Sequence, residues 1–163
     1  MADERFTDVA VARDADGIYD LVIDEAGRDL GTTDGYETAL FCSLFSDRRA
    51  AADEVADPFK RRGWIGNLTA ATAGDNYGSG LWLYEQRRAT TDVRVLLAAE
   101  ARTSLVWMIE SALVSEISTA FTYDPQSRKM VLTITERSIL GGVSHRSYEI
   151  WQATGTRQLA TNR

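Results

Sequence analysis

The segment from Asp47 to Leu83 contains three motifs: Asp47-Arg48-Arg49-Ala50, Arg61-Arg62-Gly63-Trp64-Ile65-Gly66 and Gly80-Leu81-Trp82-Leu83. Regular elements are predicted on both sides of it, so the segment would connect them over 37 residues. Connections within compact domains usually have about 2–6 residues, and structureless ones beyond about 12–15 residues are mostly functional or disordered. Disordered segments lack large apolar side chains, whereas this one holds two tryptophans. We therefore expect an ordered segment that makes contacts, and we call residues 47–83 the contact loop.

Upstream of the contact loop, the residue pattern predicts an N-terminal β-hairpin. Asp8–Arg13 and Ile18–Asp24 are predicted to be its two strands, because their apolar residues suit short extended segments. The sequence between them, Asp14-Ala15-Asp16-Gly17, is typical of a tight turn, since glycine accepts a positive φ.

A short apolar helix is predicted between this hairpin and the contact loop. Asp34 can cap its free amides, and Glu37 stands three residues later, where the partner of a capping box belongs. The helix carries little charge before Asp47, so we expect it to be largely buried, in the core or against a partner. It would present Arg48 and Arg49 at its C-terminal end, where the helix dipole favours cations.

Downstream of the contact loop, a long helix and then a sheet are predicted. Thr91 or Asp92 caps the helix, which runs to about Ala112, because apolar residues recur there every three or four positions. The period then changes to two, which predicts strands within Ile117–Tyr123, Met130–Ile134 and Val143–Trp151. The expected fold is therefore α+β: an N-terminal hairpin, a short buried helix, the contact loop, a long helix and a C-terminal three-stranded antiparallel sheet. Residues 1–152 would form a single domain, and residues 153–163 a flexible tail.

The composition predicts a globular protein that is made in the cytosol. Hydrophobic residues make up 44% of the 163 residues, but no run approaches the roughly 18 apolar residues of a membrane span. The start, Met1–Arg5, is too polar for a signal peptide. A single cysteine, Cys42, excludes a disulfide or a Cys-based zinc site within one chain, and its apolar surroundings favour a buried thiol.

Charge is distributed unevenly along the chain, whose net charge is −6. Residues 1–60 hold 15 acidic and 6 basic side chains, which gives −9, and residues 61–163 hold 9 acidic and 12 basic ones, which gives +3. This polarity suits head-to-tail contacts between different proteins better than nucleic-acid binding, which requires a concentrated basic surface. Ordinary solvated surface explains the asymmetry equally well.

Few residues could support catalysis. The single histidine, His145, lies in a predicted strand without a Ser or Cys motif beside it, so a structural or surface role is expected. Glu85, paired with Asp75, is the one candidate for the two carboxylates of a glycoside hydrolase. There is no metal-ligand spacing, phosphate-binding loop or nucleophile elbow. We therefore expect a protein that is not an enzyme and that needs no cofactor.

The contact loop holds the main candidates for partner binding. Arginine binds carboxylates in a bidentate manner and stacks on indole rings, and Arg and Trp dominate interface hot spots. These side chains could instead pack on one another and hold the loop to its own domain. Both roles remain open for Arg48, Arg49, Arg62, Trp64 and Trp82.

Three motifs in this order, Leu44-Phe45-Ser46-Asp47-Arg48-Arg49-Ala50, Arg62-Gly63-Trp64-Ile65-Gly66 and Gly80-Leu81-Trp82-Leu83, also carry a resemblance. The chain resembles the small baseplate proteins of Mu-like contractile-tailed phages, a family that is similar to the wedge protein initiating the tail sheath in other contractile phages. The similarity extends from about Asp29 to Trp151, which is most of the chain.

This resemblance implies a structural protein of the virion, located in the tail baseplate and assembled in the bacterial cytoplasm. Six copies would surround the tail tube, join other wedge proteins and provide a template for the first ring of the tail sheath. The implied mechanism is β-strand addition to an exposed sheet edge, for which the best candidate is Val143–Trp151, with Tyr148, Ile150 and Trp151. The alternatives are an assembly adaptor and a cell-wall hydrolase; no membrane or nucleic-acid partner is expected.

Overall fold

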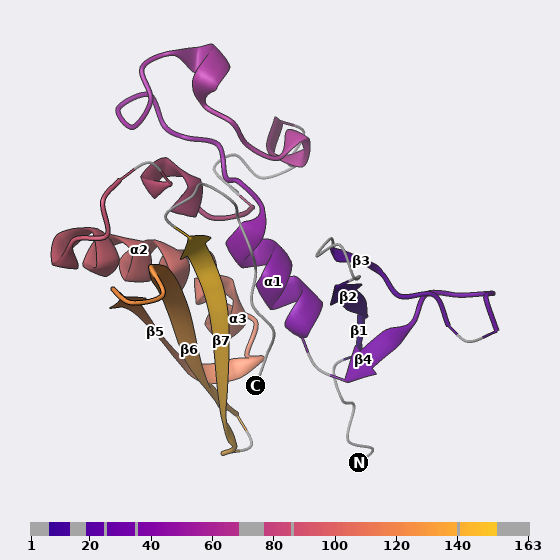
Figure 1. The fold of residues 1–163 in the computed structure, drawn as a ribbon. Coiled ribbons are helices and arrows are strands. Elements are labelled where there is room, and N and C mark those ends of the chain that lie inside the picture. The colour runs from indigo at the N-terminus through magenta and orange to yellow at the C-terminus, as the bar shows by residue number, and fades with distance from the viewer. Residues whose placement is uncertain are drawn as a thin grey trace. The chain divides into compact units, whose positions relative to one another are not determined.

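The computed structural model describes residues 7–13, 19–24, 26–34, 36–68, 77–85, 87–139 and 141–152 (Figure 1). The chain forms two compact units, Met1–Cys42 and Ser43–Arg163. The α+β class is confirmed, with N-terminal strands, helices and a C-terminal three-stranded sheet. The predicted tail, residues 153–163, lies outside the described residues.

The first unit contains two small antiparallel ladders. Strand β2 (Val11–Arg13) pairs with β3 (Tyr19–Leu21), as the hairpin prediction requires, although the predicted turn lies outside the described residues. Strand β1 (Thr7–Val9) pairs instead with β4 (Thr32–Asp34). The chain changes partner at Ala10, whose N–H donates to Gly31 at 2.8 Å and whose carbonyl accepts from Val22 at 2.9 Å.

Helix α1 (Glu37–Phe45) begins later than predicted, and the proposed capping box is wrong because Asp34 belongs to β4. The first turn is capped from β1: Asp8 Oδ2 accepts a hydrogen bond from the amide of Ala39 at 2.7 Å. The Thr38 hydroxyl also donates to the carbonyl of Val9. The carboxylate of Asp8, 31 residues away from Ala39 in the sequence, therefore provides the cap that Asp34 was expected to provide.

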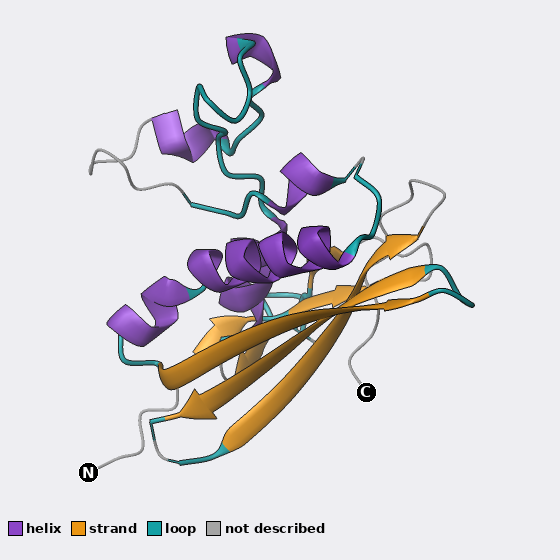
Figure 2. Cartoon of the chain, turned by 90° about the vertical axis from the view of Figure 1, so that its left-hand side faces the viewer, coloured by secondary structure: helices purple, strands orange, loops and turns teal. Residues whose placement is uncertain are grey.

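The second unit is built on a sheet in the order β5-β6-β7, with all neighbours antiparallel. Its strands, Val114–Asp124, Lys129–Ser138 and Val143–Gln152, agree with the predicted ones. Helices lie along one face of the twisted sheet (Figure 2), and the Thr119 hydroxyl donates to the carbonyl of Ala98 in the long helix at 2.7 Å. The core between them is formed by fully buried residues: Leu97, Ala101, Leu105, Met108, Leu132 and Ile134.

The predicted long helix is interrupted. It forms α2 (Thr91–Ser104) and α3 (Val106–Glu110), which are separated at Leu105. The Thr90 hydroxyl caps α2 by accepting a hydrogen bond from the amide of Val93 at 3.3 Å, one residue earlier than predicted. Ala112, expected on the buried face, is exposed and has a φ of +54°.

The described part of the contact loop contains three short 3-10 helices: η1 (Pro58–Lys60), η2 (Ile65–Leu68) and η3 (Leu81–Tyr84). Residues 69–76 lie outside the described part. Two apolar residues of η3, Leu81 and Trp82, are buried, with 4% and 9% of their surface exposed. The loop is therefore anchored at its C-terminal end by its own apolar residues.

Candidate partner-binding loop and sheet edge

Backbone hydrogen bonds bring the three sequence motifs of the contact loop together. On one side of residues 46–50, the amide of Trp64 donates to Asp47 at 2.9 Å and the amide of Ala50 donates to Arg61 at 3.2 Å. On the other side, the amide of Arg48 donates to Ser79 at 3.0 Å. The first motif thus lies between the second and the third, so residues far apart in sequence form one ordered structure.

Two glycines make this close packing possible. Gly63 has a φ of +118°, and a Cβ there would lie 2.8 Å from the Cβ of Arg49. Gly78 has a φ of +102°, and a Cβ there would lie 2.5 Å from the carbonyl oxygen of Ser46. Both positions combine a conformation that favours glycine with a backbone approach that excludes a side chain. Gly63 and Gly78 therefore lie where the segments of the loop approach each other most closely.

Arg48 is held inside the unit by two carboxylates. Its Nε lies 2.8 Å from Glu100 Oε1 of α2, and its two terminal nitrogens lie 2.7 and 2.8 Å from the carboxylate oxygens of Glu54. Glu100 Oε1 also accepts from the amide of Gly80 at 2.7 Å. The hydrogen bond from Arg48 is the main reason that the pKa of Glu54 falls from 4.5 to about 2. The hydrogen bonds with Glu54 and Glu100 raise the pKa of Arg48.

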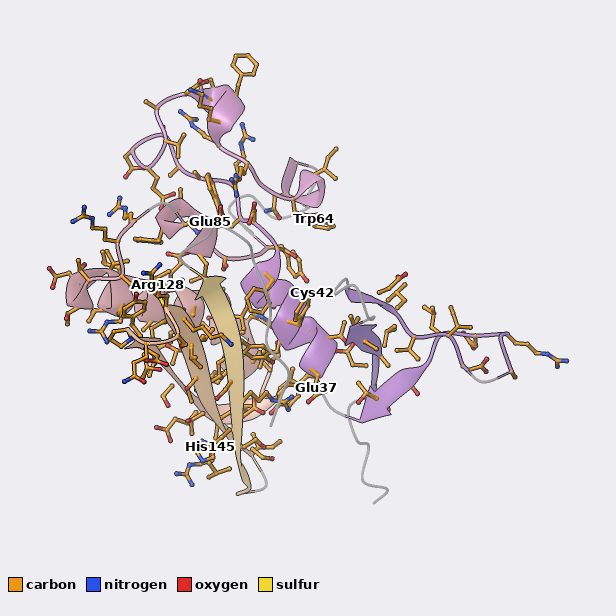
Figure 3. The ribbon with its side chains drawn as sticks, viewed as in Figure 1. Glu37, Cys42, Trp64, Glu85, Arg128 and His145 are labelled. Atoms are coloured by element: carbon orange, nitrogen blue, oxygen red, sulfur yellow. The ribbon has the colours of Figure 1, made fainter. Side chains whose placement is uncertain are left out.

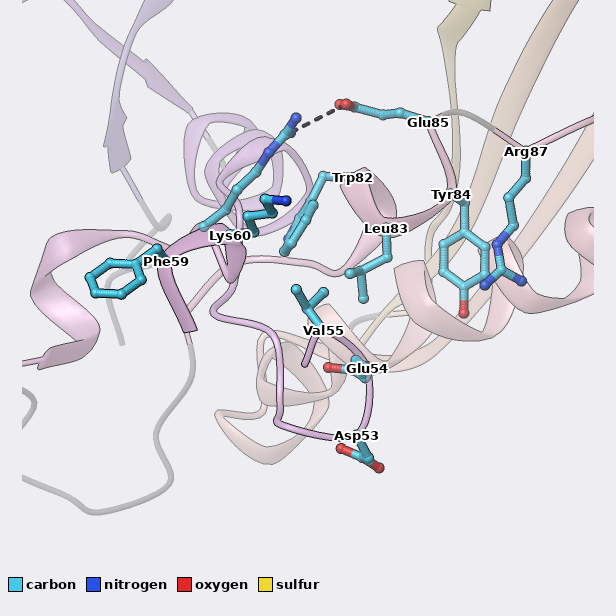
Figure 4. A pocket seen from close by; sticks show the side chains of 11 residues that line it. Asp53, Glu54, Val55, Phe59, Lys60, Trp82, Leu83, Tyr84, Glu85 and Arg87 are labelled. Carbon is cyan, nitrogen blue, oxygen red and sulfur yellow. Dashed lines mark hydrogen bonds and ion pairs between the residues drawn. The ribbon is translucent and has the colours of Figure 1, made fainter. Parts of the chain in front are cut away.

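Trp82 and Arg62 form a second internal contact. The indole N–H of Trp82 donates to the carbonyl of Arg48 at 3.0 Å, and the Arg62 guanidinium carbon lies 4.9 Å from the centroid of the Trp82 ring. Arg62 also forms an ion pair with Asp47 at 3.4 Å and one with Glu85 at 3.2 Å, and the latter is the dashed line in Figure 4. Three of the five loop candidates, Arg48, Arg62 and Trp82, therefore brace the loop.

The other two loop candidates lie elsewhere on the loop surface. Trp64 is 52% exposed, and its ring packs on that of Tyr77 with 5.3 Å between centroids. Arg49 donates to the carbonyls of Pro58 and Arg62 at 3.3 and 3.4 Å, and it has no carboxylate partner among the described residues. The five candidates thus belong to one ordered loop, but Trp64 does not join the arginine contacts.

Sequence reasoning missed two exposed apolar residues of the loop. Phe59 is 98% exposed and Ile65 is 77% exposed, on η1 and η2. Phe59 lies at the rim of an open cleft of about 700 Å³, whose apolar lining includes Val55, Trp82 and Leu83 (Figure 4). The only sequence signal for it was Asp57-Pro58, which marks a helix start as well as a chain break.

Strand β7 pairs only with β6 within the described part of the chain, so one of its edges is open there. The amide of Ser138 donates to the carbonyl of Gly142 at 2.7 Å, which makes these two residues a hydrogen-bonded pair at the start of the ladder. Because such pairs alternate along an antiparallel ladder, the register points the N–H of Tyr148 toward β6 and the N–H of Ser147 away from it.

The three residues of β7 that were predicted to bind a partner, Tyr148, Ile150 and Trp151, differ in their place in the β6–β7 ladder. The ring of Tyr148 packs edge-on against Phe45, with 5.6 Å between centroids. The register shifts after Glu149, which pairs with Val131, so that Trp151 pairs with Met130 and Ile150 is the extra residue of a bulge. The strict alternation predicted through Trp151 is therefore wrong at this point. The side chains of Ile150 and Trp151 lie outside the described part.

Three residues were considered for catalysis: Glu85, Asp75 and His145. Glu85 forms its ion pair with Arg62, and Asp75 lies outside the described residues. His145 lies at the other end of the second unit from Glu85 (Figure 3), where its Nδ1 is 3.0 Å from the Thr135 hydroxyl. Across the described residues there is no cluster of three or more His, Cys, Asp or Glu that could hold a metal ion. None of the helices in this part is long and apolar enough to cross a membrane.

Comparison with known proteins identifies the class to which this loop and sheet belong. The sequence profile of a phage protein family, described as Phage protein GP46, matches residues 36–139, from α1 to the end of β6. This match covers more than half of the chain, so the chain belongs to that family.

One curated relative is Baseplate protein gp46 of Escherichia phage Mu. It is 35% identical to this chain over 103 residues, which are 59% of this chain and 66% of that protein. The aligned region thus spans just under two thirds of the relative's length. The resemblance to Mu-like baseplate proteins, inferred from the three loop motifs, is confirmed.

Proposed function

We propose that this protein is a structural component of a phage tail baseplate. The support is its membership of the GP46 family and its similarity to a protein named as a baseplate protein. At a finer level, we propose that it is a wedge component, present in six copies around the tail tube of a contractile tail. Its partners would be the other wedge proteins, the tail sheath and the tube, and the tail would be assembled in the host cytoplasm.

The proposal that this protein is a wedge component that starts the sheath rests on the open edge of β7. It runs over the ten residues Val143–Gln152 and presents backbone groups that no described strand pairs. An open edge of this length is normally an aggregation hazard, so a protein that keeps one benefits from using it. An arm of a sheath subunit could add to this edge as a further strand, with backbone hydrogen bonds supplying the affinity. The baseplate would then start the sheath.

The experiment is a Ser147→Pro substitution in a phage that encodes this protein. Proline removes a backbone N–H that points away from β6, so β7 should keep its own ladder and lose one donor to an added strand. Tyr148→Pro is unsuitable, because the N–H of Tyr148 points toward β6 and its loss would disrupt the sheet itself.

We expect Ser147→Pro tails to have baseplates on bare or poorly sheathed tubes in electron micrographs. Ser147→Ala, which keeps the N–H, is the matched control and should give normal tails. Thermal melting of both purified variants must first show an intact fold. Full-length contractile tails in a folded Ser147→Pro variant would contradict strand addition at β7 and leave the baseplate proposal standing.

We propose no enzymatic role. The one carboxylate candidate in the described residues, Glu85, is neutralised by Arg62 at 3.2 Å, and both side chains take part in the brace beside Trp82. A glycoside hydrolase needs two carboxylates that are free to act on a sugar, whereas Glu85 and the neighbouring Asp47 both pair with the same Arg62 nitrogen. The bracing role of these residues fits a structural protein.

A further inference from the structure

An aromatic side chain extends into solvent from an ordered turn of the contact loop. The turn that carries Phe59 begins at Pro58, which fixes φ, and the Asp57 side chain accepts a hydrogen bond from the amide of Phe59 at 3.0 Å. Lys60 also forms an ion pair with Asp57 at 3.7 Å. Phe59 is nonetheless 98% exposed. Because the turn is already ordered, packing this ring against a partner would cost little conformational entropy.

Two arginines beside this turn carry uncompensated charge. Arg49 donates to the carbonyl of Pro58 at 3.3 Å, and Arg61 donates to Val55 at 2.7 Å and to Ala56 at 3.1 Å. Within the described residues, neither guanidinium forms an ion pair, in contrast to Arg48 and Arg62. The exposed ring is therefore accompanied by positive charge, and both aromatic residues and arginine are enriched in protein interfaces.

The N-terminal unit has an exposed apolar patch. Leu21, Ile23 and Leu30 are 49%, 58% and 39% exposed. Leu21 and Ile23 are two residues apart in an extended segment, and Ile23 forms an antiparallel bridge with Leu30. Alternation along extended chains then places all three side chains on one face of the ribbon. The patch therefore offers three adjacent, partly exposed apolar side chains.

Aspartates accompany each member of the patch. Asp20, Asp24 and Asp29 accept hydrogen bonds from the amides of Leu21, Arg28 and Leu30, at 2.7, 2.9 and 2.8 Å. Among the described residues, none of the three carboxylates forms an ion pair. The patch therefore offers an apolar surface next to uncompensated negative charge, which complements the Phe59 surface in both respects.

We propose that these two surfaces bind each other between copies of this chain. Phe59 of one copy would pack on Leu21, Ile23 and Leu30 of the next, while Arg49 and Arg61 pair with the neighbouring aspartates. The contact joins two different surfaces, so repeating it produces a ring if the rotation closes and a filament if it does not. Each contact is small, so it forms at high concentration or when the copies are held side by side. This inference does not depend on the proposed baseplate role.

The test is cysteine cross-linking between two variants of the full chain. Both carry Cys42→Ala, which removes the native thiol; one adds Lys60→Cys and the other adds Arg28→Cys, two exposed positions beside the two surfaces, so Phe59, the apolar patch, both arginines and the aspartates are kept. Because the cysteines are on different chains, any product that links them joins two copies. Under mild oxidation, the mixture should give about tenfold or more mixed dimer than Lys60→Cys mixed with Gln126→Cys, an exposed position on the β5–β6 turn, since burial of one ring at the contact favours the first pair by that order.

A second measurement uses no cysteine. Sedimentation velocity at high protein concentration should show that Phe59→Ser abolishes self-association, whereas Ile139→Ser, at a position that is 59% exposed and outside both surfaces, leaves it unchanged. Equal cross-linking in the two mixtures, or equal self-association of the two serine variants, would overturn the proposal. It would be overturned equally if the wild-type chain stayed monomeric and the surfaces bound other proteins.

Discussion

At the scale of single residues, the contact loop depends on charge pairs that are made inside the unit. Arg48 joins three segments, because Glu54 belongs to the loop, Glu100 to α2, and the carbonyl of Arg48 accepts from Trp82. The Arg48 and Glu100 side chains are 19% and 16% exposed. Such a pair is shielded from solvent more than an ordinary surface salt bridge and gains from having several hydrogen bonds.

Arg48→Ala should therefore lower the free energy of unfolding by about 1–3 kcal/mol, because it leaves two partly buried carboxylates without their partner. Arg102→Ala, at an exposed position of α2, is the matched control and should change stability by about 0.5 kcal/mol or less. Urea denaturation of the purified variants measures both. Equal stability of the two variants would show that the Arg48 pairs contribute nothing net.

The lowered pKa of Glu54 predicts a dependence of stability on pH. Its pKa is about 2 in the folded protein and 4.5 as the reference for the unfolded chain. A carboxylate with a depressed pKa stabilises the fold above its unfolded pKa, and this contribution is lost as pH falls toward the folded pKa. The unfolding free energy should therefore fall more steeply between pH 4.5 and about 2 in the wild type than in Glu54→Gln. If the unfolding free energies of the wild type and of Glu54→Gln depended on pH in the same way, the stabilising pairing of Glu54 with Arg48 would be refuted.

At the scale of elements, the contact loop is a layered structure rather than a flexible connection. Its first motif receives backbone hydrogen bonds from the second and the third, and glycines stand where the segments approach most closely. Long ordered loops of this kind usually carry binding residues on a rigid base. Here the base is Arg48, Arg62 and Trp82, and the exposed groups are Phe59 and Trp64.

Gly63→Ala should destabilise this layering by about 1–3 kcal/mol, because the position has a φ of +118° and the added Cβ would lie 2.8 Å from Arg49. Gly142→Ala is the control: no atom lies within 4 Å of the position that its Cβ would take, so its effect should be near zero. Differential scanning calorimetry would measure the two shifts in melting temperature. If Gly63→Ala had the same melting temperature as the wild type, the segments around Gly63 and Arg49 would be able to move apart without loss of stability.

At the scale of the whole molecule, the loop and the β7 edge are two surfaces on which a baseplate protein could bind its neighbours. Both lie in the second unit, and the family match extends from α1 to the end of β6. The loop has a rigid base with apolar residues exposed upon it, and the sheet has an open edge. Assembly and folding should therefore be separable by mutation.

Trp64→Ala should abolish co-assembly with the neighbouring baseplate proteins while leaving the isolated fold largely intact, because Trp64 is 52% exposed. Trp82→Ala provides the contrast: Trp82 is 9% exposed, and truncating such a residue costs about 3–5 kcal/mol. Circular dichroism reports folding, and co-purification with the other baseplate components reports assembly. If Trp64→Ala simply unfolds the monomer, its role is internal to the loop.

The sequence by itself determined the elements whose signal is local. Alternation of Met130, Leu132 and Ile134 identified the buried face of β6, and the spacing of Leu97 and Ala101 identified that of α2. Both periods follow from backbone geometry, which places residues two apart on one face of a strand and three or four apart on one face of a helix. The loop motifs also identified the family.

Only the tertiary structure decided which residues far apart in sequence meet. It paired β1 with β4, capped α1 with Asp8 and joined Arg48 to Glu100 across 52 residues. It also divided the loop candidates into bracing and exposed ones, since exposure depends on how the three motifs pack together. None of these contacts leaves a periodic trace in the sequence, because a hydrogen bond or ion pair between distant segments depends on the path of the chain between them.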